Sequence, residues 1–205
     1  GNHMINPYEN VDWTNAVQVK SVSHVHVLSQ SDMNKVAALG YEHIPISHYN
    51  PSSPKYPLSD FFETIPEGVI SSPNSEKVRF FSDESGHVNA LGSFLTGYGY
   101  TAGDSAASWQ TVFKLILDNL QYEDGGGITL NHPKSNSHDL RVKMLDFDPR
   151  VLGLEIYNNM TTNSADIVQM WDRILSTGRK CWGFCVIDWP SESYEPLKGS
   201  NILVT

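Results

Sequence analysis

The sequence predicts an α/β fold built on a mainly parallel sheet, contained in one domain. Apolar runs rich in β-branched residues alternate along the chain with segments of helical period, and this alternation is typical of such folds. The 205 residues suffice for one domain with a substantial core and are too few for two domains of ordinary size. A hydrophobic content of 40%, with 11% aromatic residues, is that of a globular chain.

Strands are expected where short apolar runs carry β-branched residues. The clear runs span residues 19–27, 43–47, 68–72, 127–131, 151–157 and 181–187, and weaker ones span residues 88–92 and 201–204. Residues 50–73 are rich in Pro and Ser and show little periodicity, so we expect a long loop there. Long loops in compact domains are often functional.

Helices are expected from start and stop signals as well as from period. The first starts at a cap on Asp32 and ends at Gly40, the second starts at a cap on Asp104 or Ser105, and the third runs from near Ser164 to Gly178. The second carries an apolar stripe at helical spacing, made of Trp109, Val112, Phe113, Ile116 and Leu120. These stripes predict helices that pack against the sheet.

The formal net charge of -9 argues against a sequence-independent grip on duplex nucleic acid, which needs clustered Lys and Arg. It does not argue against a small anionic substrate, because bound divalent metals invert the field of an acidic pocket. We therefore expect no nucleic-acid partner, whereas a small anionic substrate is compatible with this charge. An apolar run of 18 residues is missing, so a membrane span is not expected.

Two further features bear on processing and compartment. Residues 1–4 resemble a remnant of the expression vector, so the domain is taken as residues 5–205. Cys181 and Cys185 lie in an apolar run and are expected to be buried free thiols, which favours the cytoplasm slightly. A removed export signal and a missing C-terminal portion are both left open.

Residue types that bind metals recur at the carboxyl ends of the expected strands. His24 and His26 end the first strand, and their alternate spacing points both side chains to one face. The others follow later strands and are His48, Glu76, His132 and Asp188. In parallel α/β barrels these strand ends and their loops hold the active site. The recurrence predicts a multinuclear metal site, although each residue taken singly has an ordinary structural alternative.

Other polar residues are less informative. His43 begins an expected strand and His138 lies in an expected polar loop, so both are interpreted as structural. Glu155 points toward or away from the site depending on a strand register that the sequence leaves open. Lys134 and Arg141 could steer a phosphate, or they could be surface charges.

The ordered series resembles the PHP (polymerase and histidinol phosphatase) domain of metal-dependent phosphoesterases. His24-Val-His26 is similar to the family's first motif and Ile46-Ser47-His48 to its second, with Ser47 where an Asp is usual. Glu76 and His87 are similar to its next ligands, Asn131-His132-Pro133 to its His-Pro motif, and Asp188 to its terminal Asp. Gly153-Leu-Glu-Ile-Tyr-Asn158 also resembles a family segment, and Asp32 falls near another ligand position.

The resemblance implies a distorted seven-stranded (βα) barrel, similar to a TIM barrel. It also implies two or three divalent metal ions, commonly zinc, manganese or iron, that activate water to hydrolyse a phosphomonoester or phosphodiester. The implied metal ligands are His24, His26, Asp32, His48, Glu76, His87, His132 and Asp188. In one arrangement His24, His26, Glu76 and Asp188 hold the first metal, and Glu76 or Asp188 bridges to a second held by Asp32, His48, His87 or His132.

The terminal motif departs from the family. Where it should be Asp-x-His, this chain has Asp188-Trp189-Pro190, and neither Trp nor Pro offers a suitable lone pair. Three alternatives to an intact phosphoesterase stay open. They are a metal-dependent hydrolase of amide or lactone bonds, a metal- or ligand-binding domain without turnover, and dispersed histidines that bind no metal.

Overall fold

Five strands form the central sheet of the protein, which a computed structural model describes at residue 6 and over residues 8–81, 86–190 and 201–204. Their spatial order is β2 (Glu76–Lys77), β3 (His87–Leu91), β4 (Gly127–Asn131), β5 (Val151–Asn158) and β6 (Trp182–Val186). The pairs β2–β3 and β3–β4 are antiparallel, whereas β4–β5 and β5–β6 are parallel. A separate antiparallel pair joins β1 (Gln18–Ser21) to β7 (Asn201–Val204).

The expected seven-stranded barrel is wrong, because the observed sheet is mixed and does not close into a barrel. Residues 22–27, 43–47 and 68–72 form no ladder. Isolated bridges join these runs to their neighbours, and the bridges pair Ser21 with His43, His43 with Ile70, and Val25 with Asp188. Pro45 lacks an amide donor in the middle of one of these runs, and such a residue disfavours a central strand. The β-branched pattern alone did not reveal this interruption.

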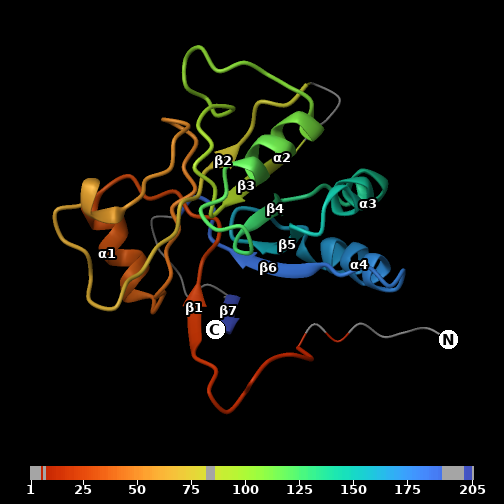
Figure 1. Cartoon of the computed structure of the whole chain (residues 1–205), viewed down its shortest axis with the longest axis horizontal. Helices are drawn as coiled ribbons and strands as arrows, with labels where there is room; N and C mark the ends of the chain where they lie inside the picture. Colours follow the sequence, from red (N-terminus) through yellow and green to blue (C-terminus); the bar gives the residue numbers. More distant parts are fainter. Residues whose placement is uncertain (1–5, 7, 82–85, 191–200, 205) are drawn as a thin grey trace.

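Four helices surround the strands in the described residues. They are α1 (Gln30–Ala38), α2 (Trp109–Asp118), α3 (His138–Phe147) and α4 (Ser164–Leu175), with one 3₁₀ turn, η1 (Leu58–Asp60), in the long loop. Figure 1 shows α3 and α4 side by side at one flank of the sheet and α1 at the opposite flank. The short parallel part of the sheet is therefore covered by α2, α3 and α4, which contact β4 and β5.

Two predicted helix caps and one predicted loop are wrong. The cap of α1 is Ser29, whose Oγ accepts from the Asp32 amide at 3.1 Å, so Asp32 lies in the first turn. The cap of α2 is Ser108, later than Asp104 or Ser105. The segment around His138 begins α3, a helix that the sequence did not predict because charged residues interrupt its apolar positions.

Alternation along β4 separates a hydrophobic face of the sheet from a polar one. Ile128 and Leu130 are fully buried in a core formed with α2, α3 and α4. Thr129 and Asn131 alternate with them, so they belong to the opposite face. That face is also buried, and its polar side chains include Asn89 and Glu155. Buried polar groups need partners, and this face is where the candidate site lies.

A second hydrophobic cluster packs under α1. Its buried members include Val22, Val25, Val27, Met33 and Ile46. Both cysteines are free thiols, but only Cys181 is buried as expected, whereas Cys185 is half-buried. Burial raises the pKa of Cys181 to about 12. Over the described residues, no helix has the length and apolar character needed to cross a bilayer.

Candidate metal centre

The segment that carries His24 and His26 is fixed by backbone contacts to Asp188. The amide of His26 donates to the carbonyl of Asp188 at 3.0 Å, and the amide of Asp188 donates to the carbonyl of His24 at 2.9 Å. Val25 and Val27 turn into the core under α1, so the alternating His24 and His26 lie on the other side. The predicted common face of these two histidines is therefore present, although no regular strand carries it.

Buried side chains replace the missing ladder bonds of this segment. Ser47 Oγ accepts from the amide of Val25 at 3.0 Å. The carbonyl of Ser23 accepts from Asn74 Nδ2 at 2.8 Å and from Asn89 Nδ2 at 2.7 Å. Each contact satisfies a backbone group that burial would otherwise leave without a partner, which makes the position of the two histidines specific.

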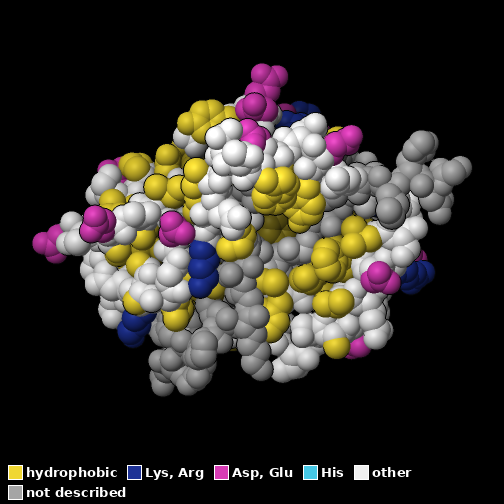
Figure 2. All heavy atoms as spheres, turned by 90° about the horizontal axis from the view of Figure 1, so that it is seen from below, with side chains coloured by type: hydrophobic (Ala, Val, Ile, Leu, Met, Phe, Trp, Pro, Cys, Tyr) yellow, Lys and Arg dark blue, Asp and Glu magenta, His cyan; other side chains and the backbone are white. Residues whose placement is uncertain are grey.

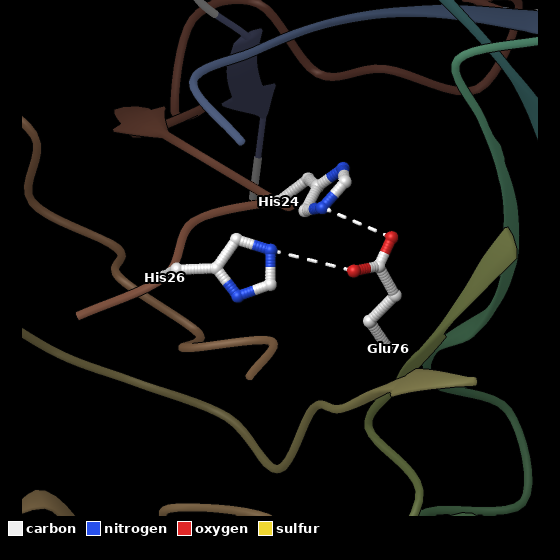
Figure 3. A group of neighbouring side chains, drawn as sticks. All are labelled: His24, His26 and Glu76. Atoms are coloured by element: carbon white, nitrogen blue, oxygen red, sulfur yellow. Dashed lines mark ion pairs between the residues drawn. The ribbon is translucent and has the colours of Figure 1, made fainter. Parts of the chain in front are cut away.

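The carboxylate of Glu76 lies at the centre of four imidazoles. Its Oε2 is 3.2 Å from His24 Nε2, 3.4 Å from His87 Nδ1 and 3.6 Å from His132 Nε2, and its Oε1 is 3.3 Å from His26 Nε2. Figure 3 shows the rings of His24 and His26 directed at the two oxygens of this carboxylate. Asn131 Nδ2 donates to Oε2 at 2.9 Å and fixes the side chain from behind.

Among the described residues, two groups have ligand atoms close enough together to hold a metal ion. One is His24, His26 and Glu76, and the other is Glu76, His87 and His132. Glu76 belongs to both. Asp188 adds a carboxylate oxygen 3.3 Å from His24 Nε2 and 3.2 Å from His26 Nε2. The arrangement therefore offers two adjacent positions that share one carboxylate.

Two buried nitrogens that face this centre have no hydrogen-bond partner among the described residues. Nε2 of His24 and Nε2 of His26 are both buried, and neither makes a hydrogen bond of acceptable geometry to the described residues. His24 Nδ1 lies 2.7 Å from Glu155 Oε2, and because a carboxylate only accepts, this ring nitrogen is the donor. A neutral His24 thus presents a lone pair at Nε2. Buried lone pairs beside two carboxylates fit a divalent cation, and imidazole with carboxylate suits zinc, manganese or iron.

Glu155 is the residue that the sequence left open and the structure places in the site. It lies on β5, is 2% exposed, and accepts from the His132 amide at 2.7 Å through Oε1. The same oxygen accepts from Asn158 Nδ2 at 3.0 Å. Asn158 also donates to Asp188 Oδ2 at 3.0 Å, so Glu155 and Asn158 connect both ends of the centre.

Strained backbone coincides with the centre. Three described non-glycine residues have positive φ, and two of them are His132 at 25° and Asp188 at 63°. This region is unfavourable for side chains with a Cβ, and residues held there often belong to functional sites. His132 directly follows β4, and Asp188 follows β6 by two residues, so both lie at carboxyl ends of parallel strands.

The electrostatics of the centre are those of buried carboxylates that need positive charge. Burial alone lowers the pKa of His24, but the nearby Glu155, Glu76 and Asp188 raise that pKa well above its usual value. Burial raises the pKa of Glu76 and of Asp188, yet His24 and hydrogen-bonding neighbours outweigh it. The pKa of Glu76 falls well below its usual range, and that of Asp188 falls to about 2. A bound divalent cation would take over the role of the His24 proton.

His48 and Asp32 are less directly placed. His48 Nδ1 is 2.9 Å from His26 Nδ1, and burial lowers the pKa of His48 to about 4, so this ring is neutral. It supports His26 and is absent from both three-residue groups. The Asp32 carboxylate accepts from the Leu28 amide at 3.2 Å and is likewise absent from those groups.

The two cations considered for phosphate binding differ in exposure. Lys134 is exposed, between His132 and α3. Arg141 is 2% exposed, so its interpretation as a surface charge is wrong. Its Nη1 donates to Met144 Sδ at 3.3 Å, and its guanidinium packs against Gly86, the residue before His87. In this structure Arg141 supports the backbone beside the site from inside.

Solvent reaches the centre mainly beside His87 and His132. The side chains of His87 and His132 are 31% and 26% exposed, whereas those of His24 and His26 are fully buried. No described histidine is visible on the face in Figure 2, where hydrophobic and acidic side chains are spread instead. Two surface hollows, of about 570 Å³ beside α1 and about 440 Å³ between α3 and α4, lie away from the centre.

Comparison with known proteins gives a fold likeness without a function. No protein-family model matches the chain, and no curated protein matches it. Among solved structures, PsfC from Pseudomonas syringae PB-5123 is similar at a TM-score of 0.55 and 11% identity, over 83% of this chain and 76% of that one. At this identity the likeness shows a shared fold alone. The resemblance to the PHP family stays a prediction.

Proposed function

We propose that the protein is a metal-dependent phosphoesterase that binds two divalent cations side by side and hydrolyses a small phosphorylated substrate. The observation that carries this proposal is the position of Glu76, whose two carboxylate oxygens lie between the buried nitrogens of His24 and His26 and the more exposed nitrogens of His87 and His132. A carboxylate in this position could serve as a ligand shared by both cations.

The buried residues of the centre would bind one cation, and the partly exposed residues would bind the other. His24, His26 and Asp188 would hold the inner cation, His87 and His132 the outer one, and Glu76 would contact both. Two such cations, when bound, supply an activated water at neutral pH and neutralise charge that develops on phosphoryl oxygens. Glu155 would keep His24 and the backbone of His132 in register with them.

Solvent exposure supports an approach of the substrate over His87 and His132. Their side chains are the partly exposed members of the centre, and Tyr100, which is 48% exposed, stands beside His87 at a ring separation of 6.5 Å. Because Arg141 is buried, neutralisation of the phosphate would depend on the metals rather than on this side chain.

The proposal is tested with metal-depleted protein to which manganese or zinc is returned, assayed on a panel of phosphomonoesters, phosphodiesters, amides and lactones. Hydrolysis of a phosphoester that requires metal, and that is lost in His26→Ala and Glu76→Ala, is expected. His138→Ala is the matched control, because His138 lies on α3, outside both groups of ligands, and its loss should leave the rate unchanged. Full activity of Glu76→Ala, or hydrolysis of amides alone, contradicts the proposal.

A metal-binding domain without turnover is the second candidate, favoured by Pro190, which stands where the PHP-like series has its last histidine. It predicts bound metal with no turnover on the whole panel. Activity that appears only in Pro190→His favours this candidate over the active enzyme.

A further inference from the structure

Trp189 packs its indole face to face on a predicted ligand of the inner cation. The ring centroids of Trp189 and His26 are 4.2 Å apart and the planes differ by 11°. His48 meets the same indole edge-on, at 5.5 Å and 90°. The residue that follows Asp188 therefore contacts the centre, although it offers no lone pair for a metal.

The indole is itself held in place at two points. Its Nε1 donates to the hydroxyl oxygen of Tyr49 at 3.1 Å. Its backbone follows Asp188, whose amide and carbonyl are both bonded to the segment of His24 and His26. A ring with so few free torsions is a rigid surface, so its stack on His26 restricts how that imidazole can rotate.

The restriction matters because His26 lacks the carboxylate partner that fixes the ring of His24. Its Nδ1 contacts His48 Nδ1 at 2.9 Å, whereas its Nε2 has no hydrogen-bond partner in the described residues and lies between Glu76 Oε1 at 3.3 Å and Asp188 Oδ1 at 3.2 Å. By contrast, His24 is fixed through Nδ1 by the carboxylate of Glu155. Among the described contacts, no carboxylate fixes Nδ1 of His26 in this way. The stack on Trp189 is therefore the contact that restricts rotation of this ring.

We propose that Trp189 is a positioning residue for the metal centre: by stacking on His26 it holds Nε2 of that imidazole toward the inner cation. This inference rests on the proposed function for the presence of metal.

The test measures metal affinity and stoichiometry, without any activity assay. Metal-depleted wild type and variants are titrated with zinc against a competing chelator, and bound zinc is counted by mass spectrometry after dialysis. Wild type is expected to bind two ions. Trp189→Leu keeps an apolar side chain without the aromatic face, and is expected to weaken one of the two ions by about 10-fold or more, as loss of a ligand's supporting contact typically does.

Two variants separate the stack from general packing. Trp189→Phe keeps a stackable ring and is expected to restore the affinity to within about 3-fold of wild type, well inside the loss expected when support is removed. Trp182→Leu makes the matched substitution at the first residue of β6 and should leave both ions unaffected. Far-ultraviolet circular dichroism checks the fold of each variant, and Tyr49→Phe, which removes the acceptor of the indole N–H, provides a milder perturbation if Trp189→Leu does not fold.

The outcomes distinguish this inference from the proposed function. Wild-type affinity for both ions in Trp189→Leu, or in Tyr49→Phe should the leucine variant not fold, overturns the positioning role while the metal centre stands. A wild-type protein that binds no zinc overturns both. Selective weakening of one ion in Trp189→Leu with recovery in Trp189→Phe supports the inference, even if no phosphoester is hydrolysed.

Discussion

His24 and Glu155 form a buried pair in which Nδ1 of the imidazole donates to Oε2 of the carboxylate over 2.7 Å. The pair sets the direction of His24, because the second nitrogen of the ring is left facing Glu76 and Asp188. Histidines that bind metals usually have such a partner on their other nitrogen, and it contributes strongly to affinity. Glu155 is therefore as relevant to the centre as the residues that would touch a cation.

Replacement of Glu155 should weaken metal binding. In Glu155→Ala, His24 loses its acceptor and the amide of His132 loses its bond to Oε1. We expect a loss of metal affinity of about 10- to 100-fold, measured by zinc titration against a chelator. Glu155→Gln keeps the shape of the side chain and one acceptor oxygen, so its loss of metal affinity should be smaller. An unchanged affinity in a folded Glu155→Ala would show that the pair does not orient a ligand.

Glu155 also shows where prediction from sequence stopped. Strict alternation along β5 could not be assumed, because the pairing of β5 with β6 shifts its register between Glu155 and Tyr157. Such an irregularity is set by the neighbouring strand and leaves no clear trace in the local pattern. From the sequence alone, the side chain of Glu155 could therefore point either toward the metal centre or away from it.

The histidines were easier to predict than the architecture that holds them. The alternate spacing of His24 and His26 required only extended backbone, and the structure brings both to Glu76. The barrel required regular parallel strands in the first half of the chain, and isolated bridges and side-chain hydrogen bonds stand in their place. Antiparallel β3 still brings its first residue, His87, opposite Asn131 at the end of β4. Different topologies can thus gather the same ligand types at one edge.

His43 should make the fold sensitive to acid. It is buried between Ser21 Oγ and Ser72 Oγ, each 2.8 Å from a ring nitrogen, and burial lowers its pKa to about 4. In the unfolded chain the pKa of this histidine is about 6.5. Between pH 6.5 and about pH 4, the unfolded state therefore binds a proton that the folded state does not. The free energy of unfolding should therefore decrease as the pH is lowered through this window, by about 1.5 kcal/mol between pH 6.5 and pH 5.

The measurement is urea denaturation of metal-free wild type and of His43→Gln at the two pH values. The variant lacks the titrating ring, so between the two pH values its free energy of unfolding should fall by about 1.5 kcal/mol less than that of wild type. Contributions from the carboxylate and histidine centre are common to both proteins and cancel in this comparison. Equal pH dependence in the two proteins would mean that His43 is not buried as a neutral ring.

Phe113 tests the packing that the helical stripe predicted. The side chain is fully buried, and its ring meets those of Trp109 and Phe147 at centroid distances of 5.0 and 5.8 Å. Phe113→Ala should reduce the free energy of unfolding by about 3–5 kcal/mol, as measured by urea denaturation. Phe61→Ala removes a ring that is 48% exposed and should cost much less. Similar losses in both variants would place Phe113 outside the main core.

Anomalous diffraction from crystals of the zinc-loaded protein tests the central claim most directly. Two zinc peaks are expected. One should lie at bonding distance, about 2.0–2.1 Å, from Nε2 of His24 and Nε2 of His26, and the other at a similar distance from His87 and His132, with Glu76 reaching both. Zinc bound only at sites remote from Glu76, or no bound zinc at saturating concentration, would contradict a two-cation centre in this protein.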